Sequence, residues 1–88
     1  MYELDLRKDV EKEFFKLAKK NPILLVKARN KINEIKANPC RSYKFLRNKF
    51  QGLNRVHVAD HFVLIFEIKH EEKRIVVHAF KHHDEAYF

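Results

Sequence analysis

Two apolar segments, separated by only five residues, constrain the fold of this chain more than any other feature. Residues 62–68 and 74–80 are apolar at both alternating sets of positions for most of their length. This pattern is typical of strands that are buried on both faces, near the centre of a sheet. Residues 69–73 are lysine, histidine and glutamate, and we expect them to form a hairpin loop. The sequence therefore predicts two central strands joined by a short charged turn.

The first 37 residues predict one strand followed by two helices. Residues 2–6 alternate apolar and acidic side chains, as in a strand with one buried face. Apolar residues then recur at helical spacing over 8–20 and again over 22–37. Asn21-Pro22 separates the helices, since asparagine can cap a helix and proline suits its first position. Asn38-Pro39 ends the second helix, and two helices joined so tightly should pack as an antiparallel hairpin.

A further strand at 55–58 and a turn at 59–61 complete the order β-α-α-β-β-β. The predicted fold class is α+β: one small domain spanning 1–88, with a mostly antiparallel, twisted sheet and the two-helix hairpin packed on one face. We expect Leu25, Ala28, Ile32 and Ile35 to form the apolar stripe of the second helix. The expected core combines residues of both helices and of strand 62–68: Leu17, Leu25, Ile32, Ile35, Phe62, Leu64, Phe66 and Ile68.

The pattern leaves the faces of the last strand open. In one alternative Ile75, Val77 and Ala79 are buried, and Lys81 and His83 then lie on the same, buried side of the strand. The other buries Val76, His78 and Phe80, and His83 then points to the open face.

Positive charge is concentrated in one segment. The 88 residues carry a net charge of +7, and no acidic residue occurs between Glu34 and Asp60. Such a segment attracts a polyanion through phosphate contacts and counterion release; the alternative is a basic but merely solvated loop. The six cations of the segment are Lys36, Arg41, Lys44, Arg47, Lys49 and Arg55.

The composition favours a reducing, cytoplasmic setting. Cys40 is the single cysteine, so an internal disulfide is excluded. No segment approaches the ~20 apolar residues of a membrane span, and the first ten residues are no signal peptide. We expect a cytoplasmic protein with no membrane partner.

All six histidines follow residue 56, which invites an acid–base interpretation. His61 and His70 fall in the predicted turn and loop, where a solvated side chain is the simpler interpretation. His78 interrupts an apolar strand, as a hydrogen-bonded sheet histidine would. For His82-His83 a zinc site is disfavoured, because adjacent strand residues point to opposite faces and only one thiolate is available. We therefore expect no metal and no cofactor.

Metal-free cleavage of RNA suits these residue types better. Transesterification needs a base for the 2′-hydroxyl proton, an acid for the 5′-oxygen, and cations for the charge on phosphorus. Residues 81–87 hold lysine, histidine and tyrosine. Arg55 and His57 share one face of a strand directly after the basic segment. This face either contacts phosphate or is simply exposed to solvent.

Six segments, in order along the chain, together form a recognisable pattern: Asn38-Pro39, 46–50, Gly52-Leu53, 55–60, 62–68 and 82–87. In these segments the chain resembles the RelE/ParE superfamily of toxin–antitoxin toxins. The resemblance implies a small cytoplasmic endoribonuclease of the RelE type, which cleaves messenger RNA in the ribosomal A site without a metal and is inhibited by a labile antitoxin. ParE-type members share the fold but poison DNA gyrase.

The resemblance also implies roles for individual residues. Arg55 and His57 fall where cations flank the scissile phosphate, His83 where the family has a catalytic arginine or histidine, and Tyr87 where it has a terminal tyrosine. His82 matches a histidine common just before that position. We expect the RNA contacts to come from cations of the basic segment and the last strand: Arg41, Lys44, Arg47, Lys49 and Lys81.

One position departs from the family pattern. Many members have an arginine that grips the phosphate after the turn and its aromatic residue, and this chain has Val63 there. Lys81 and Arg47 are the candidates to replace that arginine.

The sequence thus predicts a metal-independent, ribosome-dependent messenger-RNA endonuclease. A ParE-type gyrase inhibitor acting by protein–protein contact, and a non-enzymatic RNA-binding domain, are the alternatives. The expected partners are the ribosome, messenger RNA and a short acidic antitoxin that folds on binding and reaches segment 36–55. We expect a monomer when free and an oligomer with the antitoxin.

Overall fold

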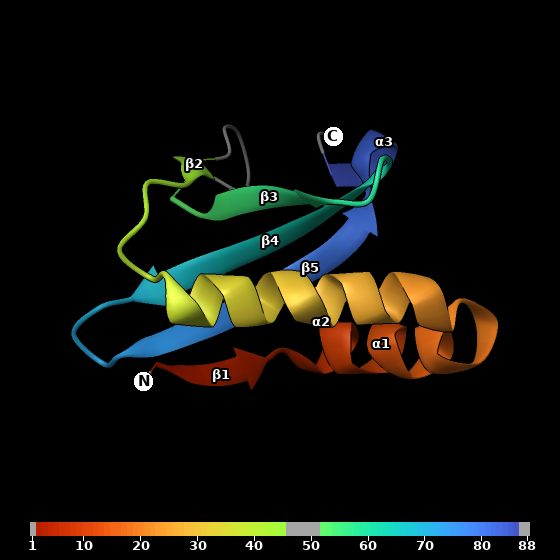
Figure 1. Cartoon of the computed structure of the whole chain (residues 1–88), viewed down its shortest axis with the longest axis horizontal. Helices are drawn as coiled ribbons and strands as arrows, with labels where there is room; N and C mark the ends of the chain where they lie inside the picture. The colour runs from red at the N-terminus through yellow and green to blue at the C-terminus, as the bar shows by residue number, and fades with distance from the viewer. Residues whose placement is uncertain (1, 46–51, 87–88) are drawn as a thin grey trace.

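The structure, a computed structural model, describes residues 2–45 and 52–86, and it has the predicted α+β fold (Figure 1). Both long helices have the predicted bounds, and the four predicted strands are present. Two short elements were not predicted: a two-residue strand inside the basic segment and a single helical turn after the last strand. The elements in chain order are β1 (Glu3–Leu6), α1 (Lys8–Lys20), α2 (Pro22–Ala37), β2 (Lys44–Phe45), β3 (Asn54–Val58), β4 (Phe62–Lys69), β5 (Arg74–His82) and α3 (His83–Ala86).

The five strands form one mixed sheet with the order β1-β5-β4-β3-β2. Strand β1 runs parallel to β5, and every other pairing is antiparallel. The chain leaves β1 at one edge and reaches β2 at the other edge after passing through α1 and α2 (Figure 1). The two central strands, β4 and β5, are the apolar segments that dominate the sequence.

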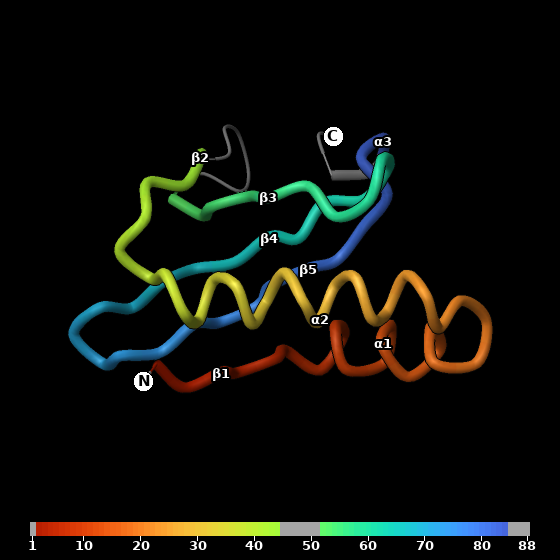
Figure 2. Tube along the Cα trace, in the orientation of Figure 1, coloured from red at the N-terminus to blue at the C-terminus, as the bar shows by residue number. Residues whose placement is uncertain are grey.

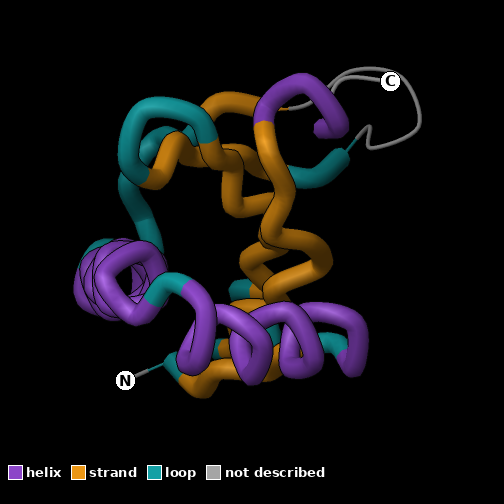
Figure 3. The backbone as a smooth tube through the Cα atoms, turned by 90° about the vertical axis from the view of Figure 1, so that its right-hand side faces the viewer, coloured by secondary structure: helices purple, strands orange, loops and turns teal. Residues whose placement is uncertain are grey.

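Helices α1 and α2 lie on the same side of the sheet, which curves around them (Figure 3). Helix α1 packs against β5, and α2 packs against β3. The tight turn between them follows from the predicted caps: Asn21 Oδ1 accepts a hydrogen bond from the Leu24 amide at 3.3 Å, and Pro22 is the first helical residue. The helical hairpin therefore covers one face of the sheet and leaves the other face for a site.

The core lies between the helices and this covered face. Leu64 and Phe66 of β4 are fully buried there, together with Ile75 and Val77 of β5. The prediction for Leu25 is wrong: Leu24 is buried instead, and Leu25 is half-buried at the edge. At about 100° per residue, Leu24 lies closer than Leu25 to the line through the other buried residues of α2. That line is formed by Ala28, Ile32 and Ile35.

A β-bulge decides the faces of β5. Ile65 pairs with Ala79 but Phe66 pairs with Val77, so His78 is an extra residue in β5. Before the bulge Ile75 and Val77 belong to the core; after it Phe80 does. Neither predicted alternative is correct, because one inserted residue reverses the alternation part-way along the strand.

Within the described ranges, no helix is both long and apolar enough to cross a membrane. The trace in Figure 2 shows that α3, at the end of β5, lies beside the turn that joins β3 to β4. This end of the sheet holds several of the residues that the sequence predicts to be functional.

Candidate functional site

Strand register brings Arg55, His57 and Lys81 to the sheet face away from the helices. His57 pairs with Val63, and Val63 pairs with Lys81 on its other side. Arg55 pairs with Ile65, the next residue of β4 on the same face. Paired residues of adjacent strands project to the same side of a sheet. Three predicted site residues from two strands therefore surround one small patch.

The floor of this patch is apolar. Val63 and Ile65 are fully buried and form a small cluster with Ala79, against which Leu53 packs. Arg55 is half-buried beside this floor, whereas His57 and Lys81 are exposed, so the electrostatic effect of a charge is strengthened by partial exclusion of water mainly at Arg55. We call the set Arg55, His57, Lys81 and this floor the cationic face.

Strand β2 extends the cationic face by one further cation. Lys44 pairs with Arg55, so its side chain leaves the same side of the sheet. The buried Asn54 holds β2 in place, since its Nδ2 donates to the carbonyl oxygens of Tyr43 at 3.2 Å and Lys44 at 3.3 Å. A two-residue strand has too few positions for a periodic signal, which is why the sequence did not reveal it.

Strand register also shows what surrounds Val63, the position at which this chain lacks the arginine of the family pattern. Its side chain is fully buried in the floor, with His57 on one side and the exposed Lys81 on the other. Lys81 of β5 thus lies directly beside the β4 position at which the family pattern has an arginine. The other candidate, Arg47, lies outside the described residues, as do Lys49 and Tyr87.

A histidine–carboxylate pair adjoins the cationic face at the bulge. His78 Nε2 and Glu67 Oε1 are 3.1 Å apart, and both side chains are half-buried. This hydrogen bond agrees with the interpretation of His78 as a sheet histidine. Glu67 was not singled out in the sequence, since one acidic residue at the end of an apolar strand carries no pattern.

Three histidines meet where β5 ends. The backbone amide of His83 donates to the His61 carbonyl oxygen at 2.7 Å, and His83 Nδ1 donates to the same oxygen at 3.1 Å. The ring centroids of His82 and His83 are 4.6 Å apart, and that of His61 lies 5.8 and 5.7 Å from them. We call these three residues the histidine cluster.

The expectation that His82 and His83 point to opposite faces is wrong. His82 is the last residue of β5 and His83 the first of α3, so the chain turns between them and strand alternation no longer applies. The antiparallel order of β3, β4 and β5 also places the turn at His61 beside the end of β5. The sequence could have revealed this proximity, because the predicted antiparallel order of the last three strands already places the turn at 59–61 beside the end of the last strand.

The predicted catalytic residues are thereby divided between two places. His82 pairs with Phe62 on the helix side of the sheet, and its ring meets the Phe62 ring edge-on at 5.5 Å. It is therefore not part of the cationic face. The carboxylate of Asp84 joins both histidines: its Oδ1 lies 3.0 Å from His83 Nε2 and its Oδ2 3.6 Å from His82 Nδ1.

Arg41 lies in the loop after α2 and not on the strands that form the cationic face. Its guanidinium contacts Glu34 Oε1 at 3.3 Å. Next to this pair, the Tyr43 hydroxyl donates to the Asn38 carbonyl oxygen at 2.9 Å. Burial raises the pKa of Tyr43; Arg41 lowers it and Glu34 raises it.

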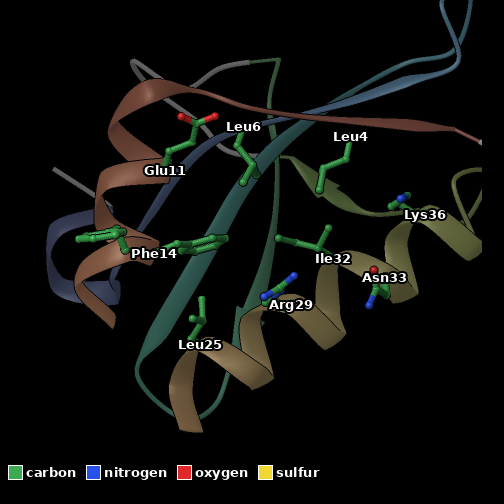
Figure 4. A pocket seen from close by; sticks show the side chains of 10 residues that line it. Leu4, Leu6, Glu11, Phe14, Leu25, Arg29, Ile32, Asn33 and Lys36 are labelled. Atoms are coloured by element: carbon green, nitrogen blue, oxygen red, sulfur yellow. The ribbon is translucent and has the colours of Figure 1, made fainter. Parts of the chain in front are cut away.

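An apolar groove lies between β1, α1 and α2 (Figure 4). Its volume is about 510 Å³. Leu6, Phe14 and Ile32 point into it, and Arg29 and Lys36 of α2 lie along it. Phe15 lines it as well and is 67% exposed. The sequence did not reveal this groove, because the same residues fit a helical core stripe.

No family model matches the sequence. An uncharacterized protein from Methanosarcina mazei is 41% identical over 87 residues, which is 99% of this chain and all of that protein. A protein of Methanocaldococcus jannaschii named "Putative toxin RelE4" is 34% identical over 87 residues, 99% of this chain and 92% of its own length. The chain belongs to the RelE family of toxins.

Solved structures of RelE and of its relatives share the fold. The isolated RelE toxin of E. coli superposes with a TM-score of 0.76 over 93% of this chain and 84% of its own, at 18% identity. A YoeB/ParE toxin from Agrobacterium tumefaciens gives 0.78 at 13% identity, covering 92% of this chain and 98% of its own. The RelBE2 toxin–antitoxin complex of Mycobacterium tuberculosis gives 0.74 at 20% identity, covering 92% and 96%. The predicted resemblance is confirmed.

Proposed function

We propose that this RelE-family protein is a ribosome-dependent endoribonuclease of the cytoplasm, which cleaves messenger RNA without a metal and so inhibits translation. The observation that carries the proposal is the cationic face, where Arg55, His57 and Lys81 converge on one side of the sheet. Membership of the family supports it, since that membership makes the chain a toxin.

The cationic face suits cleavage by transesterification. The 2′-oxygen of RNA attacks phosphorus, the bond to the 5′-oxygen breaks, and the products are a 2′,3′-cyclic phosphate and a free 5′-hydroxyl. Arg55 and Lys81 would hold the phosphate and stabilise its added negative charge. His57 and His83 are the candidates for taking the 2′-hydroxyl proton and for protonating the leaving oxygen. Tyr87 remains a predicted member of the site.

Lys81 has a specific role in this proposal, because it takes the place of the arginine missing at Val63. Lys81→Ala should slow cleavage strongly. Lys81→Arg should retain most of the rate, since the charge stays beside the same buried floor. Equal losses in the two variants would show that Lys81 does not act through its charge.

The decisive experiment compares single-turnover cleavage of messenger RNA on programmed ribosomes by wild-type protein and His83→Ala. If His83 transfers a proton, the rate should fall by ~10²–10⁴ while affinity for the ribosome is unchanged. His83→Asn keeps a side-chain donor for the His61 carbonyl and should be equally slow. His70→Ala is the matched control, because His70 is exposed in the loop after β4 and contacts Tyr2.

Three outcomes bear on the mechanism. Equal losses of binding and rate in His83→Ala would mean that His83 only holds phosphate. An unchanged rate would refute its catalytic role. Cleavage should persist in EDTA; loss on chelation with recovery on adding magnesium or zinc would refute metal independence.

A ParE-type inhibitor of gyrase is the second candidate, and the buried Val63 favours it. Such a protein acts by protein–protein contact and needs no phosphate-gripping arginine. After induced expression it should block DNA supercoiling and leave translation intact at first. Translation arrest that survives His83→Ala would instead support the non-enzymatic RNA-binding alternative.

The antitoxin would bind along the groove between β1, α1 and α2. The similar RelBE2 structure is a toxin–antitoxin complex, which supports a partner of this kind. The groove offers exposed apolar surface at Phe15, and Lys36 at its end begins the basic segment. An acidic antitoxin segment that folds on binding would bury its apolar side chains in the groove and place its carboxylates near segment 36–55.

This partner can be tested with two alanine substitutions of exposed apolar residues. Phe15→Ala should weaken antitoxin binding, mainly by faster dissociation. Ile23→Ala is the control, because Ile23 is equally exposed on α2 but lines a different depression. Equal effects of the two substitutions would place the antitoxin elsewhere.

A further inference from the structure

We propose that the histidine cluster, His61, His82 and His83, binds Zn²⁺ or a similar late first-row divalent ion. Each of the three residues offers one ring nitrogen, and these nitrogens all lie within 4.8 Å of one another. Three imidazoles form a donor set that suits zinc, cobalt and nickel, whereas magnesium and calcium prefer oxygen ligands. Such a site is outside the predicted function, which includes no metal.

The distances fit after a small inward movement of the rings. Tetrahedral zinc at about 2.0–2.1 Å from each nitrogen needs nitrogens about 3.4 Å apart. The gap to close is thus on the order of 1 Å or a little more. His61 is exposed, and the side chains of His82 and His83 are 37% and 38% exposed. Their rings can therefore turn toward a common ion without disturbing the core, because histidine χ2 has a broad range.

The backbone already holds two parts of the site together. The His83 amide and His83 Nδ1 both donate to the carbonyl oxygen of His61, which joins α3 to the β3–β4 turn. A metal-binding histidine commonly donates its other ring N–H to a backbone carbonyl, and this bond sets the tautomer that leaves the remaining nitrogen free to bind. For His83 the remaining nitrogen is Nε2, and an ion bound there would replace its contact with Asp84 Oδ1.

Asp84 lies beside two of the three rings and is the candidate for a fourth ligand. Its Oδ1 lies 3.0 Å from His83 Nε2 and its Oδ2 3.6 Å from His82 Nδ1. The Asp84 amide also donates to His82 Nδ1 at 3.2 Å, and binding through Nδ1 would exchange this exposed hydrogen bond for a metal–nitrogen bond. The group whose donor atoms lie within 4.8 Å of one another comprises the three histidines, so the Asp84 side chain would have to turn toward the ion, or a water molecule would complete the tetrahedral set.

Metal binding has a consequence that rests on the proposed function. An ion coordinated by His83 Nε2 prevents that nitrogen from taking or giving a proton. Zinc should therefore inhibit RNA cleavage, and EDTA should relieve the inhibition. The ion is an inhibitor in this scheme and takes no part in the reaction.

The binding test uses untagged protein, so that no added histidines compete. Titration with Zn²⁺ should show one ion per chain, and Co²⁺ should give the intense visible absorption of a four-coordinate site. His61→Ala should weaken both signals at least ~10-fold, and His70→Ala should leave them unchanged, since His70 lies in the β4–β5 loop. Equal affinities for these two variants, or a weak six-coordinate cobalt spectrum, would overturn the site.

A cleavage assay tests the inhibitory role separately. Each protein is compared with and without zinc against its own metal-free rate, and the ratio should fall for wild type and for His70→Ala but not for His61→Ala. Zinc that binds the cluster without lowering the ratio would refute inhibition. If no protein cleaves RNA at all, the proposed function fails while the titration still decides whether the metal site exists.

Discussion

Replacing Phe66 by alanine should lower the free energy of unfolding by about 3–5 kcal/mol, the usual cost of removing a buried phenylalanine. Phe66 lies in the centre of β4 with no exposed surface, and the ring of Tyr43 meets it edge-on at 5.3 Å. The substitution removes this ring contact, removes apolar area from the core, and leaves a cavity between sheet and helices. A chain of this length is stable by roughly 4–13 kcal/mol in total, so the loss is a large share of its stability.

The measurement is urea unfolding followed by circular dichroism, with a thermal scan as a second readout. A loss of 3 kcal/mol or more should lower the melting temperature by at least about 12 °C. Phe66→Leu leaves a smaller cavity, and its midpoint should fall between those of wild type and Phe66→Ala. This milder variant keeps the prediction testable if the alanine variant does not fold.

Phe15→Ala is the matched control, because it makes the same chemical change on the surface. Phe15 is mostly exposed. The Lys19 ammonium group lies 4.9 Å from the centroid of its ring, and among the described residues this is the one aromatic or cation–π pair that Phe15 forms. Its loss should cost less than about 1 kcal/mol. Similar costs for Phe15→Ala and Phe66→Ala would refute the burial of β4 between its neighbouring strands and the helices.

Three further predictions concern the parts of the fold that support the cationic face. Ala59 has a φ of 56°, so Ala59→Gly should leave the free energy of unfolding unchanged or raise it by up to about 1 kcal/mol. As a control, Ala18→Gly on the exposed side of α1 should lower the free energy of unfolding by about 1 kcal/mol. A loss of stability at both positions would contradict the left-handed turn at Ala59. Asn54→Ala should cost about 1–3 kcal/mol in urea unfolding, because both amide hydrogen bonds to the β2 segment are lost; no loss would show that these bonds do not hold β2. Burial raises the pKa of Tyr43. The neutral Tyr43 hydroxyl therefore contributes to the free energy of unfolding fully below about pH 10, the pKa of tyrosine in the unfolded chain, and this contribution is lost as the pH rises toward the pKa in the folded protein. Tyr43→Phe should reduce that alkaline loss, and an unchanged pH profile would contradict the shift.

The histidine cluster and the cationic face show how far the site follows from the sequence. Arg55, His57 and Lys81 were each singled out in the sequence, and strand register places all three on the open side of the sheet. His82 is separated from these residues, since it projects from the helix side beside Phe62. Strand alternation gives the right faces within β3, but it fails in β5 at the bulge around His78 and again at His83, where the chain turns into α3.

By itself, the sequence determined the number, type and order of the long elements. The bounds of α1 and α2 follow from apolar spacing and from Asn21-Pro22 and Asn38-Pro39, which act within a few residues of chain. The central position of β4 and β5 follows from apolar side chains on both faces, because only a covered strand can accept them. These signals are local, and so they can be detected along the chain.

The tertiary structure alone decided which side chains meet. The bulge at His78 reverses the faces of β5, and it becomes visible only when β4 and β5 are paired in the folded sheet. The contact between His61 and His83 joins residues 22 positions apart, and it forms because an antiparallel sheet places the β3–β4 turn beside the end of β5. Both features arise from pairing between distant segments, whose energy depends on register and packing in the folded state.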